Sequence, residues 1–443
     1  MNGIDTHPTV MAVRGRTHGP AGPLRVDPAW LRATCLEAGA DDVGFVAVER
    51  PEMDDQRGDV LAAFPSTKTL VSLIFRMNRE PVRSPARSVS NMEFHTTTEF
   101  ANEAARAIVR RLEDAGVPAM NPAAGFPMEM DRFPEKIWVV SHKPVAVAAG
   151  LGQMGLHRNV IHPKFGNFVI LDTLLVAAEV AEQGLPINYN PCVSCKLCVA
   201  ACPVGAIKPD GYFDFSACMT HNYREFMGGF TEWAETVADS GSEAEYRERV
   251  TDSESASMWQ SLAFGPNYKA AYCLAVCPAG EDVISPFLDD RAGFLGKVLT
   301  PLQEKRESVY VVPGSDAEVY VKKRFPHKTP RKAKGLRPSS IRSFLFGMKL
   351  GFQREAARGL DATYHFTFTG KEQAEAKIVI RDCTLTVTEG HIGSPSLCMR
   401  ADSATWIGFL AKEKNLLWAM LRRQIRIRGP IRLMVAFGRC FAQ

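Results

Sequence analysis

The sequence contains no hydrophobic run long enough to cross a bilayer. Its best apolar stretch, residues 169–181, is interrupted by Asp172 and Glu179, whereas a membrane-spanning helix needs about 20 apolar residues. The first 22 residues contain Pro, His, Arg and Gly where an export signal would have an apolar core, and no twin-arginine pair precedes one. These absences exclude a membrane span and predict a cytoplasmic protein.

A strong excess of either charge is also absent, with 53 Lys and Arg against 49 Asp and Glu in 443 residues. At 46% hydrophobic residues, this composition is typical of a soluble globular protein of two to three domains. One segment departs from the balance, because residues 322–342 hold nine basic residues and no acidic one. With Pro326, Pro330 and Pro338, this segment predicts an extended basic linker, which either is a solvated hinge or contacts anionic lipid or RNA.

Cysteine is sparse except in one region, since seven of the 11 cysteines lie between Cys192 and Cys277. In a reducing cytosol, clustered thiols indicate metal ligands or redox groups before they indicate disulfides. The remaining four lie in amphipathic segments and are expected to be small core residues. These four are Cys35, Cys383, Cys398 and Cys440.

The spacing Cys192-x2-Cys195-x2-Cys198-x3-Cys202-Pro203 is typical of a loop that wraps a 4Fe-4S cluster. In two-cluster ferredoxins the first three cysteines bind one cluster and the cysteine before proline binds the other. Because Cys277-Pro278 repeats the end of this motif, we expect Cys277 to complete the first cluster. A zinc site would need separated cysteine pairs or Cys/His mixtures.

By the same logic Cys202 belongs with Cys218 and Cys273, which makes a second set that is one thiol short. A full motif would place a cysteine three residues before Cys273, where the chain has Ala270. Three alternatives remain open. The second site holds a 3Fe-4S cluster, or a 4Fe-4S cluster with another ligand such as His221, or no second cluster forms.

The order of expected elements predicts a mixed α/β (α+β) protein with several domains. Helical and strand patterns alternate up to residue 185, and a capping box at Thr96 and Glu99 predicts a helix that ends at Gly116. Near the C-terminus Tyr364, Phe366 and Phe368 alternate with polar residues, as half-buried strands do. The predicted units are an α/β domain at 25–185, a cysteine domain at 186–300 with a polar insertion at 232–257, the basic linker at 301–340, and a small α+β domain at 341–443.

A glycine loop precedes the cysteine region. Gly150-Leu151-Gly152-Gln-Met-Gly155 satisfies the dinucleotide fingerprint G-x-G-x-x-G, but the following residues, with Pro163 and Gly166, do not predict the helix that such a site requires. The glycines instead predict close approach of the backbone to another large ligand or to the clusters. Acidic and histidine residues just before the loop are the candidate proton donors. They are Asp131, Glu135 and His142, of which His142 could equally be a hydrogen-bonded structural residue.

The glycine loop, the Pro163-Lys-Phe-Gly166 turn and the motif from Cys192 to Pro203 together resemble epoxyqueuosine reductases and respiratory reductive dehalogenases. The resemblance implies a nitroreductase-like domain that binds cobalamin beside two iron–sulfur clusters, with the cofactor held by the glycine loop. It implies cofactor contacts from Gly150, Leu151, Gly152, Gly155 and Gly166.

Three departures from the epoxyqueuosine reductases argue against a tRNA substrate. The position of their catalytic Asp falls near Glu135-Lys136, their Cys-Pro-Trp-Asn reads Cys277-Pro-Ala-Gly280 here, and Ala270 replaces a cysteine.

Residues 341–443 resemble a sterol carrier protein type lipid-binding domain, on the segments 364–370, 378–390 and 425–431. The resemblance implies an apolar tunnel for sterols or acyl chains. The alternative is a domain whose core is filled by its own side chains.

Together these patterns predict a cytoplasmic, cobalamin-dependent iron–sulfur reductase that takes electrons from a ferredoxin or flavodoxin and acts on a hydrophobic substrate. Peripheral contact with an anionic membrane is expected, and tRNA is not expected as a partner. One alternative is an electron-transfer protein with a lipid or membrane docking domain. The other is a tRNA-modifying reductase.

Overall fold

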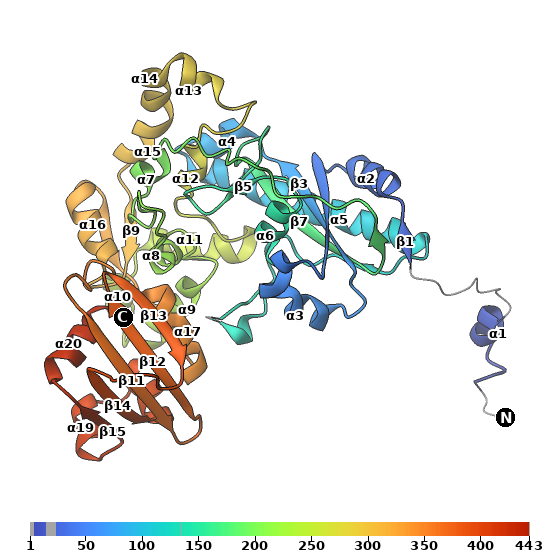
Figure 1. Cartoon of the computed structure of the whole chain (residues 1–443). Coiled ribbons are helices and arrows are strands. Elements are labelled where there is room, and N and C mark those ends of the chain that lie inside the picture. Colours follow the sequence, from blue (N-terminus) through green and yellow to red (C-terminus); the bar gives the residue numbers. More distant parts are fainter. Residues whose placement is uncertain (1–3, 15–23, 134, 443) are drawn as a thin grey trace.

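The computed structural model describes residues 4–14, 24–133 and 135–442. It has a mixed α/β architecture with several separate sheets, as predicted (Figure 1). Within these ranges, no helix combines the length and the apolar character needed to cross a membrane. The prediction that no export signal is present concerns residues 1–22, of which residues 1–3 and 15–22 lie outside the described ranges.

The α/β part is built on a four-stranded antiparallel sheet of order β2-β3-β7-β4. Apolar side chains of α2 and α5 pack on one face and those of α3 and α6 on the other, so the sheet is buried on both sides. This accounts for the nearly uninterrupted apolar sequences of its central strands. The strands are β2 (Asp42–Ala47), β3 (Thr69–Arg76), β4 (Ala119–Met120) and β7 (Val169–Val176), and the helices are α2 (Pro28–Glu37), α3 (Asp54–Ala63), α5 (Arg87–Asp114) and α6 (His142–Ala148).

Helix α5 begins nine residues earlier than its predicted capping box. Thr96 lies inside the helix, and the first turns bury Asn91 against the cysteine region. There the Asn91 Oδ1 accepts a hydrogen bond from the backbone N–H of Tyr268 at 3.0 Å. A tertiary contact therefore fixes the start of this helix, and the local capping pattern does not.

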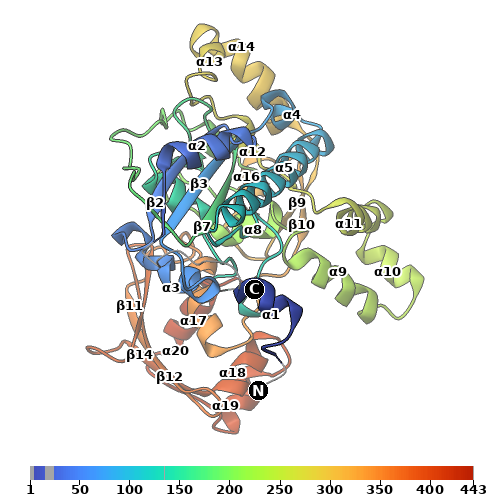
Figure 2. The same cartoon turned by 90° about the vertical axis from the view of Figure 1, so that its right-hand side faces the viewer.

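The cysteine region consists of short helices joined by long loops. Its predicted polar insertion forms three helices that project from the side of the molecule (Figure 2). The helices of the region are α7 (Leu197–Ala201), α8 (Phe215–His221), α9 (Gly228–Asp239), α10 (Glu243–Arg249), α11 (Asp252–Phe264), α12 (Tyr272–Ala275), α13 (Ser285–Asp289) and α14 (Arg291–Phe294).

The basic segment differs from the predicted extended linker. Strand β9 (Ser308–Val311) pairs in parallel with β10 (Thr329–Lys332), and α16 (Asp316–Arg324) connects them. Val309 and Val321 are fully buried in the core that also contains Cys202. The prediction of an extended linker was wrong because this segment also contains apolar side chains that pack against the cysteine region.

The C-terminal part has a five-stranded sheet of order β13-β12-β11-β14-β15 in which β11 and β14 run parallel (Figure 1). Its strands are β11 (Ala362–Thr369), β12 (Ala374–Arg381), β13 (Thr384–Glu389), β14 (Leu397–Asp402) and β15 (Ile425–Arg428). Its helices are α17 (Ile341–Gly351), α18 (Ser403–Leu410), α19 (Leu416–Leu421) and α20 (Ile431–Arg439).

Aromatic side chains fill the core of this part. Tyr364, Phe366 and Trp406 are at most 1% exposed. The ring centroids of Phe366 and Trp406 lie 6.0 Å apart, and those of Tyr364 and Phe437 lie 5.1 Å apart. The contacts support the alternative of a filled core, while the resemblance to a sterol carrier domain stays a prediction.

We expect Trp406→Ala to lower the free energy of unfolding by about 3–5 kcal/mol, because it removes a buried ring from a packed core. The matched variant Trp259→Ala, at a side chain that is 60% exposed, should change it by less than about 1 kcal/mol. Denaturant unfolding measures both. Equal losses would contradict the packed core.

Candidate functional site

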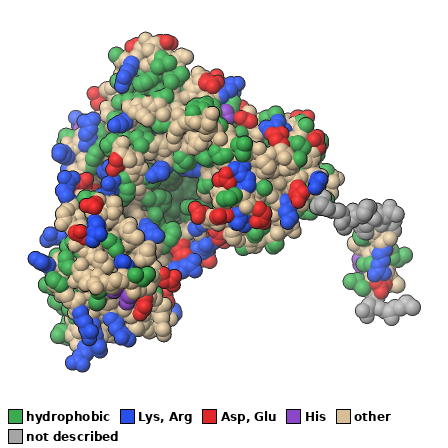
Figure 3. Space-filling view, viewed as in Figure 1, with side chains coloured by type: hydrophobic (Ala, Val, Ile, Leu, Met, Phe, Trp, Pro, Cys, Tyr) green, Lys and Arg blue, Asp and Glu red, His purple; other side chains and the backbone are tan. Residues whose placement is uncertain are grey.

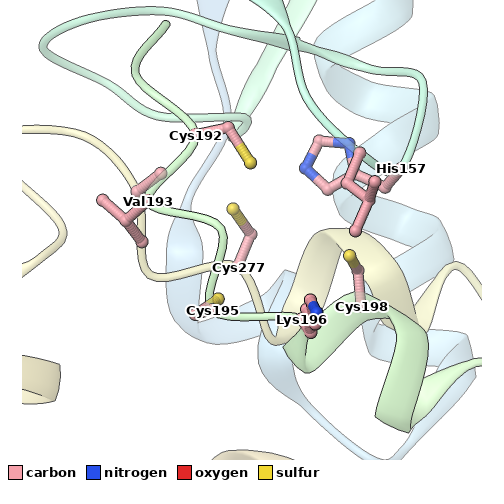
Figure 4. Close-up of a pocket in the computed structure, with 9 residues that line it drawn as sticks. His157, Cys192, Val193, Cys195, Lys196, Cys198 and Cys277 are labelled. Carbon is pink, nitrogen blue, oxygen red and sulfur yellow. The ribbon is translucent and has the colours of Figure 1, made fainter. Parts of the chain in front are cut away.

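Four thiols converge on one small pocket (Figure 4). Cys192, Cys195 and Cys198 come from the loop before α7 and from its first turn, and Cys277 follows α12. The pocket is also lined by His157 and Ala279. The structure thus brings together the four residues that the sequence pattern assigns to the first cluster.

The loop wraps the pocket because two of its residues adopt the left-handed conformation. Ser194 has φ of 50° and Lys196 has φ of 60°, a conformation that costs an L-residue free energy and persists where surrounding contacts impose it. Burial raises the pKa of the Cys277 thiol to about 12. Iron binding to such thiols must therefore release protons.

His157 supplies a test of whether the pocket fits a cluster. Its side chain is buried, its Nδ1 accepts a hydrogen bond from the backbone N–H of Asn159 at 3.1 Å, and burial lowers its pKa to about 4. The ring is therefore neutral with its proton on Nε2, and Nε2 has no partner among the described residues. A buried N–H without an acceptor is costly, and a cluster sulfide would accept it. The residues fit a 4Fe-4S cluster, which supplies one-electron transfer.

The second set of thiols lies beside the first. Cys202 ends α7, Cys218 lies on α8 and Cys273 lies on α12. Burial raises the pKa of Cys218 well above its usual value, and the neighbouring Cys202 and Cys273 raise it further. These three are therefore close enough to act on one another.

Ala270 occupies the place of a fourth ligand in this second set. In the first loop, Cys195 precedes the left-handed Lys196 and then α7. In the second, Ala270 precedes Ala271, which has φ of 52°, and then α12. The two loops share one backbone pattern, so Ala270 corresponds to Cys195.

His221 lies on α8, three residues after Cys218. Its Nδ1 accepts a hydrogen bond from the backbone N–H of Tyr310 at 3.4 Å, and its buried Nε2 has no partner among the described residues. Burial lowers its pKa to about 3, so the ring is neutral. The alternative in which His221 is the missing ligand stays a prediction.

Lys143 is the residue at this site that the sequence analysis missed. Its Nζ donates to the backbone oxygen of Arg158 at 2.9 Å and to Asn159 at 3.1 Å. Burial lowers its pKa, while the nearby Cys273 and Cys218 raise it. A cation beside a cluster raises the cluster's reduction potential. The only sequence clue is a lysine that precedes the apolar run of residues 144–149.

The glycine loop packs against protein. A side chain on Gly150 would overlap with the backbone oxygen of Leu185, and one on Gly166 with that of Ala279. Gly152 and Gly155 similarly face residue 161, and Leu151 is buried. These contacts explain the glycines as close chain-to-chain packing, and their role in cofactor binding stays a prediction.

The three predicted proton donors do not converge. Asp131 is exposed. Glu135 forms an ion pair with Arg342 at 3.0 Å. His142 is partly buried, with 14% of its side chain exposed, its Nε2 donates to the backbone oxygen of Ala123 at 3.1 Å, and burial lowers its pKa to about 4. The structural alternative for His142 therefore describes it best.

Asp172 lies next to His142 and has a more unusual environment. The His142 Nδ1 and the Asp172 Oδ1 are 4.0 Å apart, and the Asp172 Oδ2 has no partner among the described residues. Burial raises the pKa of Asp172 to about 8. In the sequence this residue is only a break in an apolar stretch, yet the fold makes it a buried carboxylic acid.

Comparison with known proteins identifies a 4Fe-4S binding domain at residues 185–208. An epoxyqueuosine reductase of Synechococcus sp. is 30% identical over 123 residues, which cover 26% of this chain and 34% of the relative. The enzyme of Gloeobacter violaceus is 23% identical over 224 residues, covering 48% and 66%. The chain thus spans about a third of the length of the first relative that it matches.

Two solved structures align with part of the chain. Epoxyqueuosine reductase from Streptococcus thermophilus aligns with a TM-score of 0.35 at 15% identity, covering 61% of this chain and 75% of that one. A catabolic reductive dehalogenase, NpRdhA, aligns with a TM-score of 0.37 at 15% identity, covering 61% and 34%.

These matches indicate an iron–sulfur oxidoreductase that is similar, over part of its length, to epoxyqueuosine reductases. They correct one expectation. The sequence departures argue against a tRNA substrate, but the matched relatives are epoxyqueuosine reductases. The expectation that tRNA is not a partner is therefore wrong.

We expect Cys195→Ala to lower the iron content by at least about one ion per chain, because the first site would then have three thiolates, as the second has, and one iron of its cluster would lose its ligand. Iron and sulfide assays after anaerobic reconstitution measure the loss. Cys398→Ala, at a cysteine on β14 in the C-terminal sheet, is the matched control and should leave both counts unchanged. Unchanged iron in Cys195→Ala would contradict the site.

We expect Asp172→Asn to flatten the pH dependence of stability. The unfolded carboxyl ionises near pH 4 while the folded one keeps its proton up to about pH 8, so stability falls as pH rises between these values. The slope is at most about 1.4 kcal/mol per pH unit. Unfolding is measured from pH 6.5 to 8, because below pH 6.5 the protonation of His142 in the unfolded state also changes the stability. The exposed Asp131→Asn should retain the wild-type slope, and an unaltered slope in Asp172→Asn would refute the argument.

Proposed function

We propose that the chain is an iron–sulfur reductase of the epoxyqueuosine reductase type that reduces a modified nucleoside of tRNA. The observation that carries the proposal is the pocket of four thiols. Cys192, Cys195 and Cys198 lie in the segment, residues 185–208, that matches a 4Fe-4S binding domain, and Cys277 joins them from outside it. The local similarity to epoxyqueuosine reductases supports the substrate class. Reduction of an epoxide would consume two electrons and two protons and release the oxygen as water, leaving an alkene.

The two thiol sets support a path for these electrons. Cys273 of the second set is among the groups that raise the pKa of Cys198 in the first, so the two sets are neighbours. Lys143, beside the second set, is on α6, and α6 packs on the central sheet of the α/β part. Electrons that enter at the first set would pass through the second toward this part.

A corrinoid is the further cofactor that we propose. The face shown in Figure 3 has a deep central hollow with many hydrophobic side chains, which suits a large and mostly apolar macrocycle. When bound, a corrinoid supplies a strongly reducing metal centre. The glycine loop would support it indirectly, because Gly150 packs against Leu185, which precedes the Cys192 loop, and Gly166 packs against Ala279, which follows Cys277.

A pocket of about 310 Å³ between the insertion helices and β10 supports RNA binding. Arg249, Arg331 and Lys332 line it together with the partly buried ring of Trp233. The two carboxylates of its wall pair with Arg224. Cations bind phosphates, and aromatic rings stack on bases. The three cations and the ring of Trp233 therefore offer phosphate and base contacts to a nucleotide.

Only part of the basic segment is available to RNA. Five of its nine cations already pair with carboxylates of this chain, as Lys334 and Arg337 do with Glu235 at 2.5 and 2.8 Å. The other three are Lys322, Lys328 and Arg342. Arg331 and Lys332 are exposed on β10 and line the pocket, so they are the residues to test.

We expect the double variant Arg331→Gln/Lys332→Gln to weaken binding of an epoxyqueuosine-modified tRNA stem loop about tenfold or more. The steepness with which the logarithm of the binding constant falls with the logarithm of the salt concentration should also decrease, by the amount that roughly one to two phosphate contacts contribute. Lys297→Gln/Lys371→Gln, with the same change of charge at two exposed lysines elsewhere, is the control. Filter binding at several salt concentrations measures both.

The activity itself is tested with the same stem loop, the iron-reconstituted protein with cobalamin, and a chemical reductant under anaerobic conditions. Mass spectrometry of the nucleosides should show loss of one oxygen. Binding without conversion would reject the epoxide as the reduced group, and absence of both would reject the tRNA proposal.

A further inference from the structure

The last part of the chain combines positive charge with exposed apolar side chains. Residues 414–443 contain seven Lys and Arg and no Asp or Glu, although the chain as a whole is nearly balanced. This segment covers α19, β15 and α20. It lies outside the residues assigned to the clusters and to RNA.

Helix α19 exposes one apolar face. Leu417 is 70% exposed, Trp418 63% and Leu421 73%. Residues three and four apart lie on the same side of a helix, so these three side chains form one strip. The opposite side is anchored by Ala419, which is buried in the C-terminal core. The strip is thus a surface feature of a folded helix.

Exposed arginines follow this strip in the chain and lie on the neighbouring strand β15. Arg422 and Arg423 follow α19 directly, and Arg426 on β15 lies opposite Arg400 on β14. The ion pairs that the described residues form in this part involve Arg342, Arg354, Arg358, Arg381 and His391, and none of Arg400, Arg422, Arg423 and Arg426. In Figure 3 a group of Lys and Arg side chains covers the lower tip, where Figure 1 places α19 and β15.

We propose that α19 and β15 form a docking surface for a membrane of anionic lipids. A tryptophan and two leucines can enter the headgroup region, while the unpaired arginines contact lipid phosphates. RNA would satisfy the arginines but would leave the two leucines in water. An acidic protein would need a complementary apolar surface, whereas a membrane provides both chemistries at once.

Helix α20 also combines exposed apolar side chains with an exposed arginine. Ile431 is 60% exposed and Val435 is 52% exposed, four residues apart, with the exposed Arg432 between them. The attachment is therefore peripheral and shallow, and it concentrates the full chain at the lipid surface without a membrane-spanning helix among the described residues.

The test is co-sedimentation of the full chain with vesicles of phosphatidylcholine alone or of phosphatidylcholine and phosphatidylglycerol at about 3:1. We expect binding to the anionic vesicles only, and loss of it at high salt. Arg422→Gln/Arg423→Gln should weaken binding about 25-fold, since each cation near an anionic surface contributes roughly fivefold. Leu417→Ser/Leu421→Ser should weaken it about tenfold or more.

Leu288→Ser is the matched control, because this leucine on α13 is 67% exposed, and it should bind as the wild type does. Binding to neither vesicle, or equally to both, would overturn the proposal. So would concentration-dependent dimers that Leu417→Ser/Leu421→Ser abolishes, which would make the strip an interface between two copies. A loss of stem-loop binding in Arg422→Gln/Arg423→Gln, with vesicle binding intact, would assign the arginines to RNA instead.

Discussion

The backbone contact between the Gly166 turn and the loop after Cys277 is the constraint on which the site depends. A side chain on Gly280 would overlap with the backbone of Gly166, and the N–H of Glu281 donates to the Pro163 oxygen at 2.9 Å. This contact holds Cys277, far along the chain, against the α/β part. In this position the Cys277 thiol lies beside the three thiols that precede it in the chain by about 80 residues. Without the contact, the first pocket would lack its fourth thiol.

The same contact explains part of the unusual sequence. Ala279 stands where the epoxyqueuosine reductases are expected to carry tryptophan, and here it is buried with its oxygen against Gly166. The departure is thus a feature of packing, and it gives no information about the substrate. Ala270 is a different kind of departure, because it replaces a ligand in a loop whose backbone follows the first loop.

The cysteine pocket could be predicted because metal-binding spacing is a local property of the sequence. Lys143 and Asp172 could not, because their unusual environments arise from burial by segments distant in the chain. The basic segment was misinterpreted for a similar reason, since Val309 and Val321 reveal their role only when the cysteine region packs on them. The charged residues and prolines of the segment indicate its exposed surface, but they do not indicate which of its side chains are buried in the core.

Mössbauer spectroscopy of the protein reconstituted anaerobically with iron-57 tests the central claim most directly, namely that the seven thiols divide into a complete and an incomplete cluster site. The account predicts two components, a 4Fe-4S cluster with four thiolates and a second cluster with only three. In Ala270→Cys the second component should change to that of a four-thiolate cluster. A single component that Ala270→Cys does not alter would contradict the division.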